Sequence, residues 1–102
     1  MVRTQINARF HLFIAVAVVL IGWGLGVSPS EWAILGLCIG SVLAAEAFNT
    51  ALEQLADAVS LEPNERIGRA KDLGSAGVLI AALCSAVAGV LIFGPKLWMW
   101  IA

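Results

Sequence analysis

The sequence predicts an all-α integral membrane protein whose subunit consists of three transmembrane helices. Apolar residues make up 61% of the 102 positions and charged residues only 13%, and the mean hydropathy is +0.95. A soluble domain needs a more polar surface than this composition supplies. The net charge of −1 provides no basic field for a nucleic-acid backbone, so we expect no nucleic-acid partner. A chain this short forms one domain, residues 1–102, and encloses little interior, which favours an oligomer.

The first predicted span, residues 10–27, contains one ionisable side chain, His11, and is long enough to cross a membrane with slight mismatch. Arg3 and Arg9 before it resemble the basic start of a signal peptide. The apolar run exceeds the roughly 7–15 residues of a signal-peptide core, and no small-residue cleavage site closes it, so we expect a retained helix. We interpret His11 as a packed or interfacial polar residue.

The second predicted span, residues 31–57, begins at the tetrapeptide Ser28-Pro29-Ser30-Glu31. This pattern predicts a capping box in which Ser28 is the N-cap, Pro29 is the first helical residue and Glu31 bonds back to free backbone amides. The helix is apolar as far as Ala45 and then becomes polar without a break. Its polar half carries Glu46, Asn49, Glu53 and Asp57.

The third predicted span, residues 72–93, is uncharged from residue 73 onwards and is expected to stop at Gly94-Pro95. The connection before it, residues 58–72, contains Pro63, which we expect to open the third helix. Two pairs of glycines spaced four apart, Gly22 with Gly26 and Gly36 with Gly40, predict ridges for close helix packing. Cys38 and Cys84 lack metal-ligand spacing and are interpreted as small buried thiols.

The basic residues predict how the chain is oriented. Five of the six basic residues lie before the first span or in the second connection, and the first turn has none. The five are Arg3, Arg9, Arg66, Arg69 and Lys71, and Lys96 is the single basic residue beyond the third span. Because cytoplasmic loops are enriched in Lys and Arg, we expect a cytoplasmic N-terminus and an outer C-terminus. Four tryptophans fall near the outer helix ends, where an aromatic belt would lie: Trp23, Trp32, Trp98 and Trp100.

Helix geometry predicts that several polar residues lie at similar depth. At about 1.5 Å per residue, Glu46 lies roughly 21 Å from Trp32, inside a hydrocarbon layer of about 30 Å, and Glu53 lies roughly 31 Å from it. Four residues of the other two helices lie at roughly 27–33 Å when counted from Val27 on the first helix and from Phe93 on the third: Arg9, Gln5, Lys71 and Asp72. At about 100° per residue, Glu46, Glu53 and Asp57 share one helix face, with Asn49 to its side.

The cost of placing these carboxylates in a membrane must be offset by another interaction. Insertion of a charged residue at the centre of a transmembrane helix costs roughly 2.5–3.5 kcal/mol. A divalent cation on Glu53 and neighbouring oxygens would offset this cost and would attract a phosphate-rich substrate such as a nucleotide. Glu46, deeper and drier, is suited to accept a proton from a hydroxyl that arrives from the lipid. Lys71 and Arg69 suit phosphate oxygens. The alternative, which applies best to Asp57, is a set of ion pairs that seals helix packing.

These residues also carry a family resemblance. The stretch Ala45-Glu46-Ala47-Phe48-Asn49-Thr50-Ala51-Leu52-Glu53, with Asp57, is followed by Gly68-Arg69-Ala70-Lys71-Asp72-Leu73-Gly74-Ser75-Ala76. This pattern resembles the prokaryotic diacylglycerol kinase family, which includes the undecaprenol kinases, and the resemblance runs from residue 5 to about residue 95. It implies a homotrimer with sites between subunits. MgATP would enter from the cytoplasm, and a lipid alcohol would arrive laterally from the membrane.

The resemblance implies a role for each matched residue. Glu46 resembles the catalytic base of the family and Glu53 its metal-binding glutamate, so Mg²⁺ and ATP are expected. Asn49 and Asp57 would support the metal and nucleotide site, Lys71 would contact ATP phosphate and Asp72 would order the site. We expect Arg9 and Arg69 to assist nucleotide binding, and Ser75 to contact the lipid substrate together with Glu46.

The N-terminal stretch Gln5-Ile6-Asn7-Ala8-Arg9-Phe10-His11 departs from the family pattern, in which the first position is normally a glutamate that joins the metal site. Glutamine offers one carbonyl oxygen and no charge, so affinity for Mg²⁺ should be lower. We also expect no amphipathic surface helix of the kind that usually precedes this stretch in the family.

We therefore predict a membrane lipid kinase that transfers the γ-phosphate of ATP to diacylglycerol or undecaprenol, with activity weakened by Gln5. Two alternatives stay open at this point: a kinase-like membrane subunit without activity, and a small oligomeric cation or proton transporter that uses Glu46. The Lys71-Asp72 pair favours the kinase, because it suits phosphate and has no obvious use in cation transport.

Overall fold

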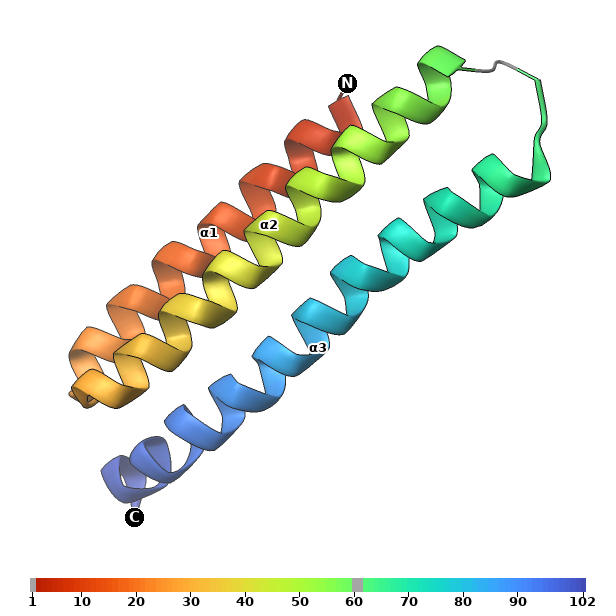
Figure 1. Ribbon diagram of the computed structural model, residues 1–102. Coiled ribbons are helices and arrows are strands. Elements are labelled where there is room, and N and C mark those ends of the chain that lie inside the picture. The colour runs from red at the N-terminus through yellow and green to blue at the C-terminus, as the bar shows by residue number, and fades with distance from the viewer. Residues whose placement is uncertain (1, 60–61) are drawn as a thin grey trace.

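The chain forms three long α-helices in the order α1 (Val2–Leu25), α2 (Pro29–Val59) and α3 (Glu65–Ile101). This computed structural model describes the backbone of residues 2–59 and 62–102 and the side chains of residues 9–59 and 62–102. The helices lie along one another in a molecule of 57 × 22 × 21 Å (Figure 1). α2 packs against both neighbours, and more extensively against α3.

The two ends of the molecule differ in composition. The α1–α2 turn and the C-terminus share one end, and the α2–α3 connection lies at the other (Figure 1). The first end, which we call the tryptophan end, contains Trp23 in the last turn of α1, Trp32 in the first turn of α2, and Trp98 and Trp100 near the end of α3. The tryptophans are therefore gathered at one end, as an aromatic belt requires.

The α1–α2 turn is fixed by two local motifs. Gly26 has a φ of +69° and closes α1 as a Schellman cap, in which Val27 donates to the carbonyl of Gly22 at 3.2 Å. The predicted capping box of α2 is confirmed: the backbone amide of Ser28 donates to Glu31 Oε1 at 2.9 Å, and that of Glu31 donates to Ser28 Oγ at 3.2 Å. Gly26 is thus a helix cap, which corrects its expected role as a packing residue.

The small-residue ridges have different surroundings. A Cβ added to Gly22 would lie 2.9 Å from the ring of Trp32, so this glycine permits close contact between α1 and α2. Around Gly36 and Gly40, by contrast, nothing in the described part of the chain comes within 4 Å of an added Cβ. Among the described residues, the second ridge therefore has no close helix neighbour.

Both ends of α3 differ from the predicted ones. It begins at Glu65, where the side chain of Asn64 accepts bonds from the backbone amides of Arg66 and Ile67 at 2.9 and 3.2 Å. The expectation that Pro63 opens the helix is wrong, because Asn64 is the N-cap and Pro63 precedes it. Asn is among the best N-cap residues, since its side-chain oxygen satisfies amides that the helix leaves free.

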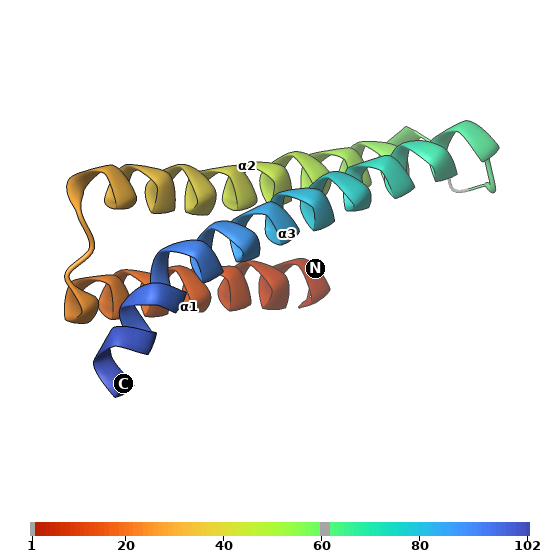
Figure 2. The same ribbon diagram turned by 90° about the horizontal axis from the view of Figure 1, so that it is seen from below.

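The C-terminal end of α3 was predicted to stop at Gly94-Pro95, and this prediction is wrong. The helix continues through Pro95 to Ile101, and its last turns bend away from the preceding axis (Figure 2). Proline removes one helical hydrogen bond and kinks a helix without ending it when the flanking segment is held elsewhere. Lys96 Nζ lies 3.0 Å from Glu31 Oε1, so an ion pair fastens the segment beyond the kink to the start of α2.

Apolar side chains face outward along the molecule. The buried core of the described residues is limited to Val27, Leu35 and Ile92, whereas Phe13 is 72% exposed and Leu91 70%. α2 and α3 are long and apolar enough to cross a membrane, and only 6% of the most apolar stretch of each is buried. The described apolar part of α1, Arg9–Leu25, is shorter than the length that a membrane-spanning helix needs. Low burial of long apolar helices is typical of a protein whose solvent is lipid.

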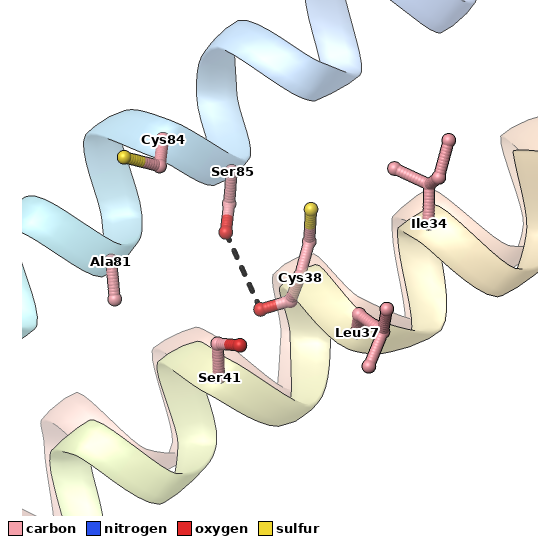
Figure 3. A pocket seen from close by; sticks show the side chains of 7 residues that line it. All are labelled: Ile34, Leu37, Cys38, Ser41, Ala81, Cys84 and Ser85. Carbon is pink, nitrogen blue, oxygen red and sulfur yellow. Dashed lines mark hydrogen bonds between the residues drawn. The ribbon is translucent and has the colours of Figure 1, made fainter.

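A shallow apolar hollow lies between α2 and α3, toward the tryptophan end (Figure 3). Ser85 Oγ donates to the carbonyl oxygen of Cys38 at 3.3 Å across it, which ties the two helices together. Both cysteines line the hollow as free thiols. Cys38 is partly buried and Cys84 is exposed, so the expectation of a buried thiol is wrong for Cys84.

Candidate active site

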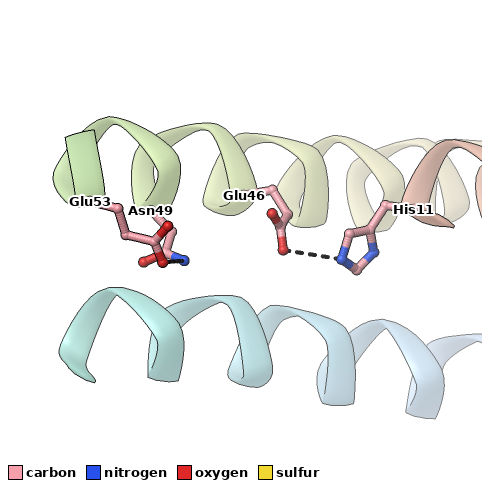
Figure 4. A network of polar contacts seen from close by, with 4 residues as sticks. All are labelled: His11, Glu46, Asn49 and Glu53. Atoms are coloured by element: carbon pink, nitrogen blue, oxygen red, sulfur yellow. Dashed lines mark hydrogen bonds and ion pairs between the residues drawn. The ribbon is translucent and has the colours of Figure 1, made fainter. Parts of the chain in front are cut away.

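Three polar side chains of α2 form a row that faces α3. Glu46, Asn49 and Glu53 project on the same side of α2 (Figure 4), because residues spaced by three, four and seven positions share a helix face. All three are partly buried in a bundle whose surface is otherwise mostly apolar. We call Glu46, Asn49 and Glu53 the polar row.

His11 of α1 meets the inner end of the polar row. Its Nε2 lies 3.2 Å from Glu46 Oε1, and the two side chains are only 19% and 15% exposed. His11 was interpreted as a packed or interfacial residue, and its contact with Glu46 was not foreseen. A signal was available in the sequence: counted from Val27, His11 lies roughly 24 Å down its helix, close to the depth of about 21 Å for Glu46.

Asn49 connects the row to α3. Its Nδ2 donates to Glu53 Oε1 at 3.3 Å, whereas its Oδ1 is buried and has no hydrogen-bond partner among the described residues. That oxygen sits against Gly74 of α3, where an added Cβ would collide with it. A side chain at position 74 would therefore displace Asn49. No sequence pattern predicts this close approach of Asn49 to Gly74.

Asp57 and Lys71 join α2 to α3 at the end of the row. Lys71 Nζ lies 2.8 Å from Asp57 Oδ1, with the side chains 42% and 51% exposed. The pKa of Lys71, which lies outside the expected span 72–93, is raised above its usual value, first by the hydrogen bond that Lys71 donates to Asp57 and then by the negative charge of Asp57. Lys71 therefore keeps its positive charge at neutral pH, and water screens much of the pair's contribution to stability.

The remaining candidates are not gathered with the row within one subunit. Arg69 pairs with Glu65 at 3.5 Å, one turn earlier on α3, and both side chains are largely exposed. Arg9 on α1 and Asp72 and Ser75 on α3 are also exposed. The side chain of Gln5 lies outside the described residues.

The polar row fits a magnesium ion that is only partly held by protein. Mg²⁺ prefers oxygen ligands and is often bound by one or two carboxylates together with waters and substrate phosphates. Glu53 supplies a carboxylate, and a half-turn of the Asn49 amide brings the partnerless Oδ1 beside it. No group of three or more His, Cys, Asp or Glu side chains suitable for a metal occurs among the described residues. These oxygen ligands suit an ion that binds together with a nucleotide. They are too few for an ion that is ligated by protein side chains alone.

Comparison with known proteins decides the family. The family model for prokaryotic diacylglycerol kinase matches residues 1–93, nearly the whole chain. The chain belongs to the prokaryotic diacylglycerol kinase family. It is 37% identical over 95 residues to an undecaprenol kinase of Bacillus subtilis, an alignment that covers 93% of this chain and 77% of that protein.

Two other relatives are named diacylglycerol kinase. The protein of Synechocystis is 35% identical over 95 residues, which cover 92% of this chain and 54% of the relative. The protein of Escherichia coli is 36% identical over 74 residues, which cover 72% of this chain and 60% of the relative. Prokaryotic diacylglycerol kinases are membrane lipid kinases with ATP as phosphoryl donor, so the predicted enzyme class is confirmed.

Proposed function

We propose that this member of the family transfers the γ-phosphoryl group of ATP to a lipid alcohol in a bacterial inner membrane. The observation that carries the proposal is the polar row, in which Glu46 lies partly buried among apolar helices and Glu53 lies two turns nearer the charged connection. A lipid hydroxyl reaches Glu46 from the bilayer, and the phosphates of ATP reach Glu53 from the cytoplasm. Undecaprenol is our preferred substrate, because the match to the undecaprenol kinase covers 77% of that relative.

In the proposed reaction Glu46 is the general base. The hydroxyl oxygen of the lipid forms a bond to the γ-phosphorus, the bond from that phosphorus to the β–γ bridging oxygen breaks, and ADP leaves with the electron pair. The hydroxyl proton passes to the Glu46 carboxylate. Glu53 and Asn49 would hold Mg²⁺ when ATP is bound, and the ion would supply positive charge that screens the phosphates. Catalysis by the remaining residues consists of positioning.

The other candidate residues are assigned to the nucleotide, the metal and the lipid headgroup. Lys71 binds phosphate oxygens, in exchange for its contact with Asp57, and Asp57 then assists the metal site. Arg9, Arg69 and Asp72 complete the nucleotide site, Gln5 contributes a neutral oxygen to the metal, and Ser75 contacts the lipid headgroup.

The substrate is tested by supplying radiolabelled ATP to the purified protein in bilayers that contain undecaprenol, diacylglycerol or neither. We expect label in the lipid fraction with undecaprenol and less label with diacylglycerol. Faster labelling of diacylglycerol would overturn the preference for undecaprenol, and labelling of neither lipid would overturn the proposed function.

Replacing Gly74 by alanine tests the role of Asn49. The new Cβ collides with Asn49 Oδ1 and turns the side chain away from Glu53, so we expect transfer to fall about 10- to 100-fold, as for other small misplacements at active sites. Gly77→Ala is the matched control, because it makes the same change one turn along α3, where nothing lies within 4 Å in the described structure. Steady-state rates of both variants check this, and equal activity in the two would show that the orientation of Asn49 is not used.

We also propose a homotrimer with the N-terminus in the cytoplasm and the C-terminus outside. Two observations support an assembly: Asp72 and Ser75 are exposed on α3, and Gly36 and Gly40 present a ridge without a close neighbour among the described residues. A neighbouring subunit that covers the ridge allows close helix approach. Light scattering corrected for detergent should give the mass of three chains, and a fully active monomer would contradict shared sites.

A further inference from the structure

The contact between His11 and Glu46 crosses from α1 to α2 inside the bundle. The ring nitrogen and the carboxylate oxygen are 3.2 Å apart, and each side chain is more than four-fifths buried. Among the described residues, this is the one hydrogen bond of the Glu46 carboxylate. The ring of Phe10 lies edge-on to that of His11, with centroids 6.0 Å apart.

The contact has a direction. The general base of the proposed reaction acts as a carboxylate, which can only accept a hydrogen bond, so in that reaction Nε2 of His11 donates and Oε1 of Glu46 accepts. This arrangement occupies one carboxylate oxygen and leaves Oε2 free. A glutamate side chain has three rotatable bonds, and a bond to a second helix restricts them at the position where the proton must be accepted.

We propose that His11 is a positioning residue for the reaction: it holds Glu46 so that the free carboxylate oxygen faces the hydroxyl of the lipid alcohol. This inference rests on the proposed function of Glu46 and extends it to α1. A purely structural bond between α1 and α2 would affect folding and leave turnover per folded enzyme unchanged.

The test compares His11→Phe, which keeps an aromatic ring and removes the donor, with His11→Gln, whose amide N–H still donates. Ser85→Ala is the matched control, because it removes another interhelical hydrogen bond of similar length, between α2 and α3. We expect His11→Phe to lower kcat about 10- to 100-fold, as for other misplaced catalytic groups, with KM for ATP unchanged. His11→Gln should recover most of the loss, and Ser85→Ala should keep the kcat of the wild type.

A second background makes the test specific for Glu46. Glu46→Asp shortens the side chain by one methylene and takes its carboxylate out of reach of His11. In that background His11→Phe should lower kcat little further. An equal loss in both backgrounds would show that His11 acts independently of Glu46 and would overturn the inference.

Other outcomes are equally decisive. Wild-type kcat in His11→Phe, a rise in KM for ATP in place of the fall in kcat, or failure of His11→Gln to recover activity would each overturn the positioning role. If His11→Phe does not fold, His11→Met serves as the variant without a donor, with the same expectations. Absence of transfer by the wild type to any lipid alcohol would instead overturn the proposed function.

Discussion

Substitution of Glu46 by glutamine should abolish phosphoryl transfer while leaving the membrane protein folded. General base catalysis contributes about 10²- to 10⁴-fold, so we expect kcat to fall by at least about 100-fold. Stability should stay the same or rise, because the neutral amide costs less to bury than a carboxylate and still accepts a bond from His11. Steady-state transfer assays and thermal unfolding in the same detergent check the two expectations together.

The opposite directions of activity and stability make this prediction specific. A variant with both properties reduced would indicate that Glu46 mainly holds α1 and α2 together. Turnover near that of the wild type would show that Glu46 accepts no proton in the reaction.

Substitution of Glu53 by glutamine should raise the Mg²⁺ concentration needed for half-maximal activity. The variant loses a charged oxygen ligand and retains a neutral one, and Asn49 loses its charged hydrogen-bond partner. Because replacement of even an outer-shell partner costs roughly 10- to 100-fold in metal affinity, we expect a shift of at least about tenfold. Titration of activity with Mg²⁺ at saturating ATP measures it.

Glu31→Gln is the control for this shift. It makes the same chemical change on the same helix, but Glu31 lies at the tryptophan end, where it pairs with Lys96. Its Mg²⁺ requirement should match that of the wild type. If Glu53→Gln also kept the wild-type requirement, the metal would lie elsewhere and the assignment of Glu53 would be wrong.

The sequence predicted the helical class and the α1–α2 turn because both depend on local chemistry. Three apolar runs mark three helices, and the Ser28 to Glu31 motif encodes its own hydrogen bonds, which are confirmed. The ends of α3 were predicted less well. Hydropathy marks the apolar part of a helix, whereas Asn64 begins α3 in polar sequence and the Lys96–Glu31 ion pair holds the turns beyond Pro95. That pair joins residues far apart in the sequence, so a local rule about proline could not anticipate it.

The candidate site was predicted in part. Spacing on one helix correctly places Glu46 and Glu53 on a common side of α2, and Asn49, which was expected beside that face, projects on the same side. The contact of His11 with Glu46 depends on the rotation of α1 about its axis, which the nearly uniform apolar surface of α1 does not specify. The role of Gly74 depends on the distance between α2 and α3. Asp72 and Ser75 are exposed in the single chain, and their assigned roles stay predictions.

In the proposed function, the enzyme converts ATP and a membrane alcohol into ADP and a lipid phosphate at the polar row. The most direct test measures both products from the purified wild-type protein in undecaprenol-containing bilayers with Mg²⁺. The proposed function predicts one ADP for each lipid that gains a phosphoryl group, with formation of ADP depending on the lipid. ADP and free phosphate formed without a phosphorylated lipid, or no ADP at all, would contradict it.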